Sequence, residues 1–206
     1  MLTGIDISHW QGNVDFNKVK KSGIDFVIIK AGGSDNGFYE DIKFKSYYKQ
    51  AKDVGLYVGC YYFAGPKFLG DLSGEADAKR FLKIIGGLKF EFPVYIDVEL
   101  TSIPTDKFKT TSATISFCRY MEYNKYYCGI YASDISGFRD MLDLSRLDRF
   151  DKWVARYGSS PKYVKSYGMY QFSNSGFING IHGKVDLDCA YKNYPHIIKL
   201  NHLNGY

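Results

Sequence analysis

Phe26-Val27-Ile28-Ile29 is apolar at every position, and this stretch decides how the sequence folds. A strand with one face in water alternates apolar and polar residues, whereas a parallel strand covered on both faces reads as a continuous apolar run. The flanking segments 15–23 and 41–54 instead carry apolar side chains at helical spacing, and each stops at a glycine. Because 56–63 is again a continuous apolar run, the sequence opens with buried parallel strands that alternate with helices.

This alternation continues through the first two thirds of the chain and then changes. We expect strands over 2–7, 26–29, 56–63, 92–99, 128–132, 152–157, 169–172 and 184–190. Ser73 and Asp134 are expected to cap two of the later helices, but the gaps between the last three strands are too short for full helices. The spacing predicts an α/β fold, an irregular TIM-like (β/α) barrel of about five βα units followed by three strands with little helix.

Length and composition indicate one soluble globular domain. The chain has 206 residues, of which 45% are hydrophobic and 24% charged. Residues 1–191 are expected to form the barrel, and 192–206 a short C-terminal tail. The net charge of +5 would attract anionic polymers, although lysine-rich helix faces explain it equally simply. No Lys/Arg block is long enough for a nucleic-acid arm, and Gly32-Gly33 lacks the residues of a phosphate or dinucleotide loop.

The chain start and the cysteines exclude several other classes. Met1-Leu2-Thr3-Gly4 enters the first strand directly, so we expect no signal peptide and synthesis in the cytoplasm. No apolar run reaches the roughly 18 residues of a membrane span, so no membrane partner is expected. The four cysteines form no CxxC pair, which argues against a zinc site, and we expect no metal or cofactor. Cys60 and Cys118 fall in apolar segments typical of buried thiols, while a disulfide remains open.

Acidic residues lie on three of the predicted strands, at the ends where a parallel barrel gathers its catalytic groups. They are Asp6, the pair Asp97 and Glu99, and Asp186. Residues i and i+2 of a strand point to the same face, so Asp97 and Glu99 would line the barrel mouth together. Two like charges beside apolar walls raise the pKa of one acid, which then keeps its proton. A proton donor beside an anion is what the cleavage of a glycosidic bond requires.

These acids also have simpler explanations. Asp97 and Glu99 could form a structural pair with Lys or Arg, Asp6 could cap the following turn, and Asp188 could be a turn acid. Four acids on one rim nevertheless favour function, because such a cluster destabilises a fold unless it is retained for a purpose.

Aromatic residues could line a carbohydrate cleft, because the chain has 19 Tyr and 15 Phe and these rings stack on sugars. Trp10 could be a sugar platform or could cover the barrel end, and His9 is typical of a turn or solvent position. Several tyrosines lie near predicted strand ends, where each suits the core as well as a cleft: Tyr61, Tyr62, Tyr131, Tyr157 and Tyr170. We expect substrate to be bound by Tyr62, Tyr131, Tyr157 and Trp10.

Six stretches, in order along nearly the whole chain, resemble the family 25 glycoside hydrolases, the Chalaropsis-type lysozymes. They are GIDISHWQG at 4–12, FVIIKA at 26–31, YYFA at 61–64, YIDVE at 95–99, WVARY at 153–157 and GIHGKVDLD at 180–188. The resemblance implies a barrel of five βα units and three further strands. It implies an N-acetylmuramidase that cuts the β-1,4 bond between N-acetylmuramic acid and N-acetylglucosamine in bacterial peptidoglycan.

By position in the family's motifs, Glu99 looks like the general acid and Asp97 like its partner. Asp97 would attack directly or orient the substrate's acetamido group, and Asp6 and Asp186 would be supporting acids of the same cleft. The resemblance favours Asp186 over Asp188 for this role.

The sequence departs from the family at some positions. The family often has His where Tyr62 stands, Trp where Tyr170 stands and an acid at Gly32 or Gly33. These departures affect sugar contacts more than the acid pair. The chain carries no wall-binding repeat, so the pattern resembles a phage or prophage endolysin that is made in a bacterial host, reaches the wall after release and acts as a monomer.

Three other functions stay open on the sequence. A non-catalytic glycan-binding module on the same barrel would be expected to lack one of the acids. A chitin-type hydrolase could use the same D-x-E strand. A metal-dependent deacetylase would need a His pair near the acids, which the sequence does not show.

Overall fold

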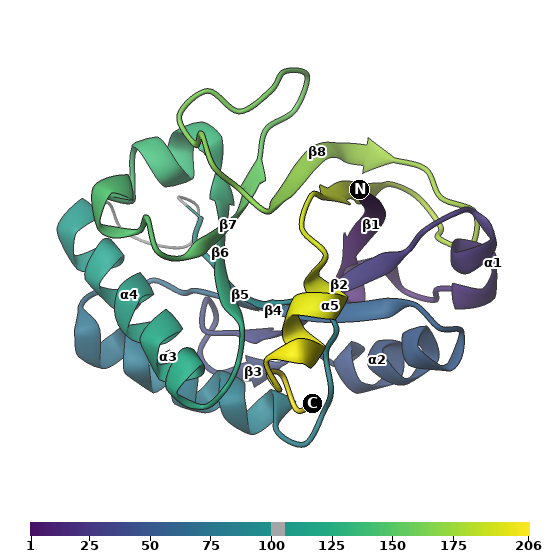
Figure 1. Ribbon diagram of the computed structural model, residues 1–206, viewed down its shortest axis with the longest axis horizontal. Helices are drawn as coiled ribbons and strands as arrows, with labels where there is room; N and C mark the ends of the chain where they lie inside the picture. Colours follow the sequence, from purple (N-terminus) through teal and green to yellow (C-terminus); the bar gives the residue numbers. More distant parts are fainter. Residues whose placement is uncertain (100–105) are drawn as a thin grey trace.

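The structure, a computed structural model, describes residues 1–99 and 106–206, and the strands in these residues form one sheet that closes on itself (Figure 1). The strands are β1 (Leu2–Ile7), β2 (Phe26–Gly33), β3 (Tyr39–Glu40), β4 (Tyr57–Phe63), β5 (Val94–Asp97), β6 (Cys128–Ser133), β7 (Asp151–Ala155), β8 (Met169–Gly176) and β9 (Val185–Ala190). Their order is β1-β9-β8-β7-β6-β5-β4-β2-β3, and β1 also pairs with β2. The predicted irregular (β/α) barrel is therefore confirmed.

Strand direction distinguishes β9 from its neighbours. In the series β1, β2, β4, β5, β6, β7, β8, each strand runs parallel to the next. Strand β9 closes the barrel between β8 and β1 and is antiparallel to both. The carboxyl ends of the parallel strands meet at one rim of the barrel, and the beginning of β9 reaches that same rim. Asp186, the second residue of β9, therefore pairs with Asp6 near the end of β1.

The helices lie outside the barrel. They are α1 (Phe16–Lys21), α2 (Phe44–Asp53), α3 (Asp71–Ile85), α4 (Lys107–Tyr123) and α5 (Tyr194–Leu200), with shorter turns η1 (His9–Gln11), η2 (Asp134–Arg139) and η3 (Leu144–Arg146). Asp15 caps α1, and its side chain accepts from the Lys18 N–H. The predicted caps Ser73 and Asp134 are wrong, because Gly70 precedes α3 and Ser133 caps η2. No helix among the described residues is long and apolar enough to cross a membrane.

Strand alternation separates the side chains into two cores. Those that point outward pack under the helices, and Val94 and Ile96 of β5 belong to this set. The side chains that point inward fill the barrel interior with large rings, which include Phe26, Tyr95 and Trp153. Each large ring buried in this way stabilises the fold by about 1.5–3 kcal/mol. These rings therefore fill the barrel interior beneath the acidic rim.

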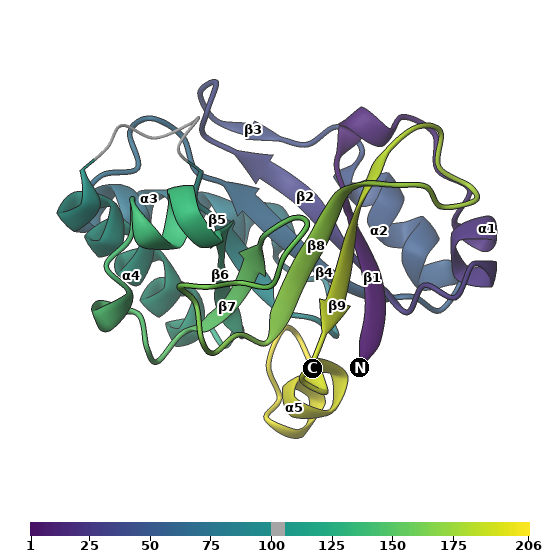
Figure 2. The ribbon, with the colours of Figure 1, turned by 90° about the horizontal axis from the view of Figure 1, so that it is seen from above.

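The C-terminal segment belongs to the barrel and is not a loose tail. Tyr194 and Ile198 of α5 are buried in the inner cluster with Phe92. Asn204 is buried as well, and its amide donates to the Phe92 carbonyl at 2.8 Å. Figure 2 shows α5 at the end of the barrel where β1 begins. Residues 192–206 thus close the end opposite the acidic rim.

All four cysteines are buried free thiols in this structure. Cys60 and Cys118 lie in the core between the sheet and the helices, as their apolar surroundings predicted.

Candidate active site

The rim of the barrel encloses two adjoining cavities. The smaller, of about 340 Å³, opens into the barrel and is lined by Asp6, Asp97, Glu99 and Asp186 among others. The larger, of about 540 Å³, lies over β6 and β7. Glu99 and Tyr131 line both cavities, so Glu99 stands where the two meet. The structure therefore brings together all four acids that the sequence predicted.

Asp97 is more deeply buried than Glu99, the other acid of the pair. It is only 4% exposed, and one carboxylate oxygen, Oδ1, is buried without a hydrogen-bond partner. Burial, followed by the negative charge of Glu99, raises the pKa of Asp97 well above its ordinary value, and Lys30 opposes this rise. An oxygen that is desolvated and left without a protein donor is suited to a donor from a bound ligand.

Asp6 is hydrogen-bonded to another residue that lines the smaller cavity. Its Oδ2 accepts a hydrogen bond of 2.6 Å from the Gln171 side chain on β8. Burial and the charges of Asp188 and Asp186 raise the pKa of Asp6 well above its ordinary value, although the Gln171 contact lowers it. Gln171 was not predicted from the sequence, because nothing in its surroundings marks it before β8 and β1 are placed on the same rim.

Asp186 and Asp188 occupy two levels of β9. Asp186 lines the smaller cavity, and burial with the charge of Glu99 raises its pKa to about 6. Asp188 is fully buried one level deeper, where Trp153 Nε1 donates to it at 2.8 Å. Burial raises the pKa of Asp188 to about 8. The expected preference for Asp186 over Asp188 thus agrees with their positions, since only Asp186 lines the cavity.

Two charged residues of the smaller cavity were not predicted. Lys30 is buried, and its ammonium lies 4.3 Å from the centroid of the Phe63 ring. Asp35 lies close by and accepts a hydrogen bond of 2.7 Å from the Tyr39 hydroxyl. A lysine inside a fully apolar strand is a signal in itself, because an unpaired buried charge is costly. Asp35 also lies close to Gly33, one of the two positions at which the sequence lacks the acid common in the family.

The described residues include no group of three or more His, Cys, Asp or Glu side chains that could hold a metal ion. The site contains several carboxyl groups whose pKa values are shifted to different extents. Such a set can keep one acid protonated beside an ionised one near neutral pH, which suits general acid catalysis at an acetal.

Comparison with known proteins identifies the group to which this barrel belongs. The sequence model of glycosyl hydrolases family 25 matches residues 5–181, which include Asp6, Asp97 and Glu99. The chain belongs to glycosyl hydrolases family 25. The family predicted from the sequence is therefore confirmed, and Asp186 lies just beyond the matched stretch.

Two lysozymes are similar over most of the chain. The autolytic lysozyme of Clostridium acetobutylicum is 35% identical over 188 residues, which cover 91% of this chain and 55% of that protein. Lysozyme M1 of Streptomyces globisporus is 29% identical over 205 residues, which cover 90% of this chain and 66% of that protein. The chain thus spans 55% and 66% of the lengths of these two relatives.

A solved family 25 structure has the same fold. The crystal structure of the CTP1L endolysin is similar with a TM-score of 0.83 and 28% identity, over 97% of this chain and 70% of that chain. The bacterial lysozyme of Streptomyces coelicolor has a TM-score of 0.76 at 24% identity, over 97% of this chain and 96% of that chain.

The predicted aromatic contacts of this family 25 barrel are only partly at the cavities. Tyr131 and Tyr157 line the larger cavity, and both hydroxyls donate to Gln171, at 2.9 and 2.6 Å. Trp10 lines the smaller cavity and is 80% exposed. It stacks obliquely on His9, whose Nδ1 lies 2.7 Å from a carboxylate oxygen of Asp41. Trp10 is thus an exposed ring on a fixed turn.

The structure contradicts the prediction for Tyr62. It is 0% exposed and packs against Phe81 and Phe117 under the helices, so the prediction that Tyr62 binds substrate is wrong. Its neighbour Tyr61 lines the smaller cavity instead. The reason is strand alternation, because Tyr61 pairs with the inward Tyr95 and Tyr62 with the outward Ile96.

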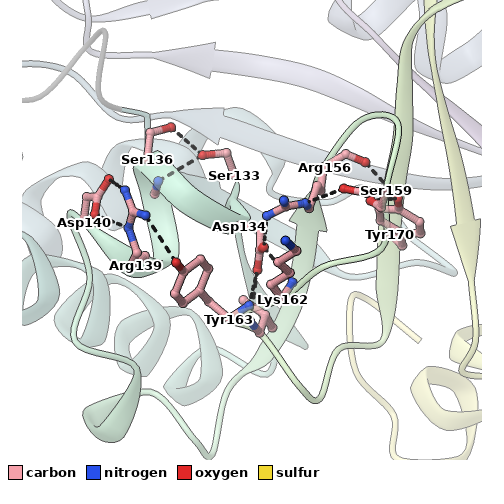
Figure 3. A network of polar contacts seen from close by, with 12 residues as sticks. Ser133, Asp134, Ser136, Arg139, Asp140, Arg156, Ser159, Lys162, Tyr163 and Tyr170 are labelled. Carbon is pink, nitrogen blue, oxygen red and sulfur yellow. Dashed lines mark hydrogen bonds and ion pairs between the residues drawn. The ribbon is translucent and has the colours of Figure 1, made fainter.

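Figure 3 shows a polar network, and four of its residues, Ser133, Asp134, Ser136 and Arg156, also line the larger cavity. Asp134, at the start of η2, accepts four hydrogen bonds from the segment after β7. The donors are Arg156 Nη1 at 2.7 Å and the backbone N–H groups of Lys162, Tyr163 and Val164 at 2.7, 2.9 and 3.0 Å. Because Asp134 is buried, this single carboxylate joins two segments that flank the cavity.

Proposed function

We propose that this chain is an N-acetylmuramidase, which hydrolyses the β-1,4 bond between N-acetylmuramic acid and N-acetylglucosamine in bacterial peptidoglycan. The observation that carries this proposal is the position of Glu99 at the junction of two cavities. A glycan that ran through both cavities would present a glycosidic oxygen at that junction. The lysozymes and the endolysin among the relatives support peptidoglycan as the polymer.

In this proposal Glu99 is the general acid and Asp97 is its anionic partner. The two carboxyl groups repel each other when both are ionised, and this repulsion contributes to the raised pKa of Asp97 and favours a pair that holds one proton. Lys30 opposes the rise in the pKa of Asp97, and we assign the donated proton to Glu99 from its place at the junction of the two cavities. Glu99 then protonates the departing oxygen. Asp97 stabilises the positive charge that grows at the sugar carbon, either directly or by orienting the substrate's acetamido group.

Asp6 and Asp186 support the pair in this scheme. Asp186 and Glu99 both line the smaller cavity, and the charge of Glu99 contributes to the raised pKa of Asp186. Asp6 is oriented by Gln171, which in turn accepts from Tyr131 and Tyr157. The negative field of this group would stabilise an oxocarbenium-like transition state. Trp10 would offer its exposed ring as a platform for a sugar face.

The likeness to an endolysin supports a finer proposal about context. We propose that the protein acts on the bacterial cell wall as a phage or prophage lysin.

The test is digestion of purified peptidoglycan by wild type and Glu99→Gln, with reduction and mass identification of the new sugar ends. We expect Glu99→Gln to lower turnover by about three orders of magnitude, because proton donation and charge placement are lost together. The control is Glu75→Gln, which alters an exposed ion pair with Lys79 on α3 and should retain full activity. Thermal denaturation of each variant verifies that it is folded.

The outcomes separate the candidate functions. New muramic acid reducing ends from wild type, and not from Glu99→Gln, would support the muramidase. New glucosamine ends would assign the cut to the other bond. Cleavage of chitin oligomers in preference to peptidoglycan would favour a chitin-type hydrolase, and no new ends from any wall would favour a binding module.

A further inference from the structure

The larger cavity contains one positively charged group among its lining residues, and the acid chemistry described above does not use it. Arg156 follows β7, and its side chain is only 16% exposed. The cavity also has an apolar wall from Ile135 and Tyr157 and the hydroxyl groups of Ser133 and Ser136. It therefore offers a cation beside an apolar surface, adjacent to Glu99.

Arg156 is held so that part of its guanidinium remains available. Nη1 donates to Asp134 at 2.7 Å and Nε donates to Ser159 at 2.8 Å. Within the described residues, no protein acceptor is paired with Nη2. Figure 3 shows the side chain fixed between these two partners. An arginine that is already ordered loses little conformational entropy when it binds a ligand through its remaining N–H groups.

The electrostatics of the cavity make this cation significant. Asp134 is already compensated by three backbone N–H groups as well as by Arg156. A negatively charged ligand group entering beside Glu99 would be repelled by the acids of the rim. Arg156 is the group in the larger cavity that can offset this repulsion, with a charge-assisted hydrogen bond.

We infer that the larger cavity binds a carboxylate carried by muramic acid, and that Arg156 donates to it through Nη2. This inference rests on the proposed function. Muramic acid differs from glucosamine by a lactyl ether, which brings a methyl group and a carboxyl group. The methyl group matches the apolar wall at Ile135 and the carboxylate matches Arg156. The carboxylate is that of the lactyl group in strands without stem peptides, or one on the stem peptide where the lactyl group is amidated.

The experiment compares kcat/KM of wild type and Arg156→Gln on three glycans. The first is amidase-treated strands with free lactyl carboxylates, and the second is the same strands with these groups converted to methylamides. The third is strands with intact stem peptides. Arg149→Gln is the matched control, because Arg149 is 57% exposed, pairs with Glu122 and does not line the cavity. Thermal denaturation verifies that each variant is folded.

We expect Arg156→Gln to lose about tenfold in kcat/KM on the glycan whose carboxylate it binds, mostly through KM. The loss on methylamide strands should be less than twofold, and Arg156→Lys should restore part of the activity. A loss on free-acid strands identifies the lactyl group, and a loss on peptide-bearing strands identifies the stem. An equal loss on all three glycans would mean that Arg156 only supports the cavity wall, and no loss on any would also overturn the inference. Failure of the proposed function would look different, because wild type itself would cleave none of them.

Discussion

Asp134→Ala tests whether one buried carboxylate holds the wall of the larger cavity. The substitution removes four hydrogen bonds, three of them from consecutive backbone N–H groups at residues 162–164. Bonds to an ionised acceptor contribute about 1.5–3 kcal/mol each, but such contributions do not add fully and water reaches part of this segment. Breaking a buried pair by removing one partner typically costs about 3–5 kcal/mol. We therefore expect Asp134→Ala to lower the free energy of unfolding by about 3–5 kcal/mol.

For a chain of this size, each kcal/mol shifts Tm by roughly 2–4 °C, so Tm should fall by about 10 °C. The measurement is thermal unfolding followed by circular dichroism at neutral pH. Asp140→Ala is the control, because Asp140 pairs with Arg139 in the same network at 2.6 Å but is largely exposed. An exposed ion pair contributes about 0–1 kcal/mol, so the control should shift Tm by only a few degrees. If the two variants lost equal stability, the reasoning about Asp134 would be refuted.

The pH dependence of this difference has a definite sign. Burial alone raises the pKa of Asp134, but the N–H groups of Lys162 and Val164 and the Arg156 guanidinium together lower it below its ordinary value. A carboxyl group with a lowered pKa stabilises the fold above its unfolded pKa, near 3.9. This contribution is lost as pH falls through the lower folded value. The Tm difference between wild type and Asp134→Ala should therefore be full at pH 6–7 and shrink progressively below about pH 4.

Three further substitutions have expected outcomes. Asp97→Asn should lower kcat on peptidoglycan by about 10²-fold or more with Tm unchanged or raised, because it removes a buried anion of the same shape; wild-type turnover would disprove its role. Trp10→Ala should raise KM about three- to tenfold without changing Tm, since the ring is exposed at the cavity; an unchanged KM would exclude a sugar platform. Asp188, whose pKa is raised to about 8, contributes stability below its unfolded pKa that is lost as pH rises through about 8. Asp188→Asn should therefore flatten the fall in Tm between about pH 4 and 8, and parallel pH profiles would contradict this assignment.

Much of the site could be predicted because its signals are local. Strand alternation predicted Asp97 and Glu99 on one face before the strand's neighbours were known. Both acids line the smaller cavity, although β5 ends at Asp97 and Glu99 follows just after it. The continuous apolar runs predicted a sheet covered by helices, and their spacing predicted the three closing strands. Asp6 reached the predicted rim because β1 ends there as a parallel strand, next to β2.

Other features depend on which strands pair and in which direction. Asp186 was expected because acids gather where strands end, yet it lies at the beginning of β9. It reaches the rim only because β9 runs antiparallel to β1. Tyr61 and Tyr62 are adjacent and chemically alike, so only the register with β5 decides which ring faces the cavity.

The sequence by itself predicted the barrel, the strand that carries Asp97, and the position of Asp97 and Glu99 at the rim, because each follows from periodicity within a few residues. Tertiary structure alone decided the contacts between distant segments. Gln171 meets Asp6 across 165 residues, and Arg156 meets Asp134 across 22. Those contacts arise from the closure of the sheet and the path of the connecting segments, and no short sequence pattern encodes them. The physical reason is that burial and charge at the rim are properties of all the strands together, which no strand possesses before the barrel closes.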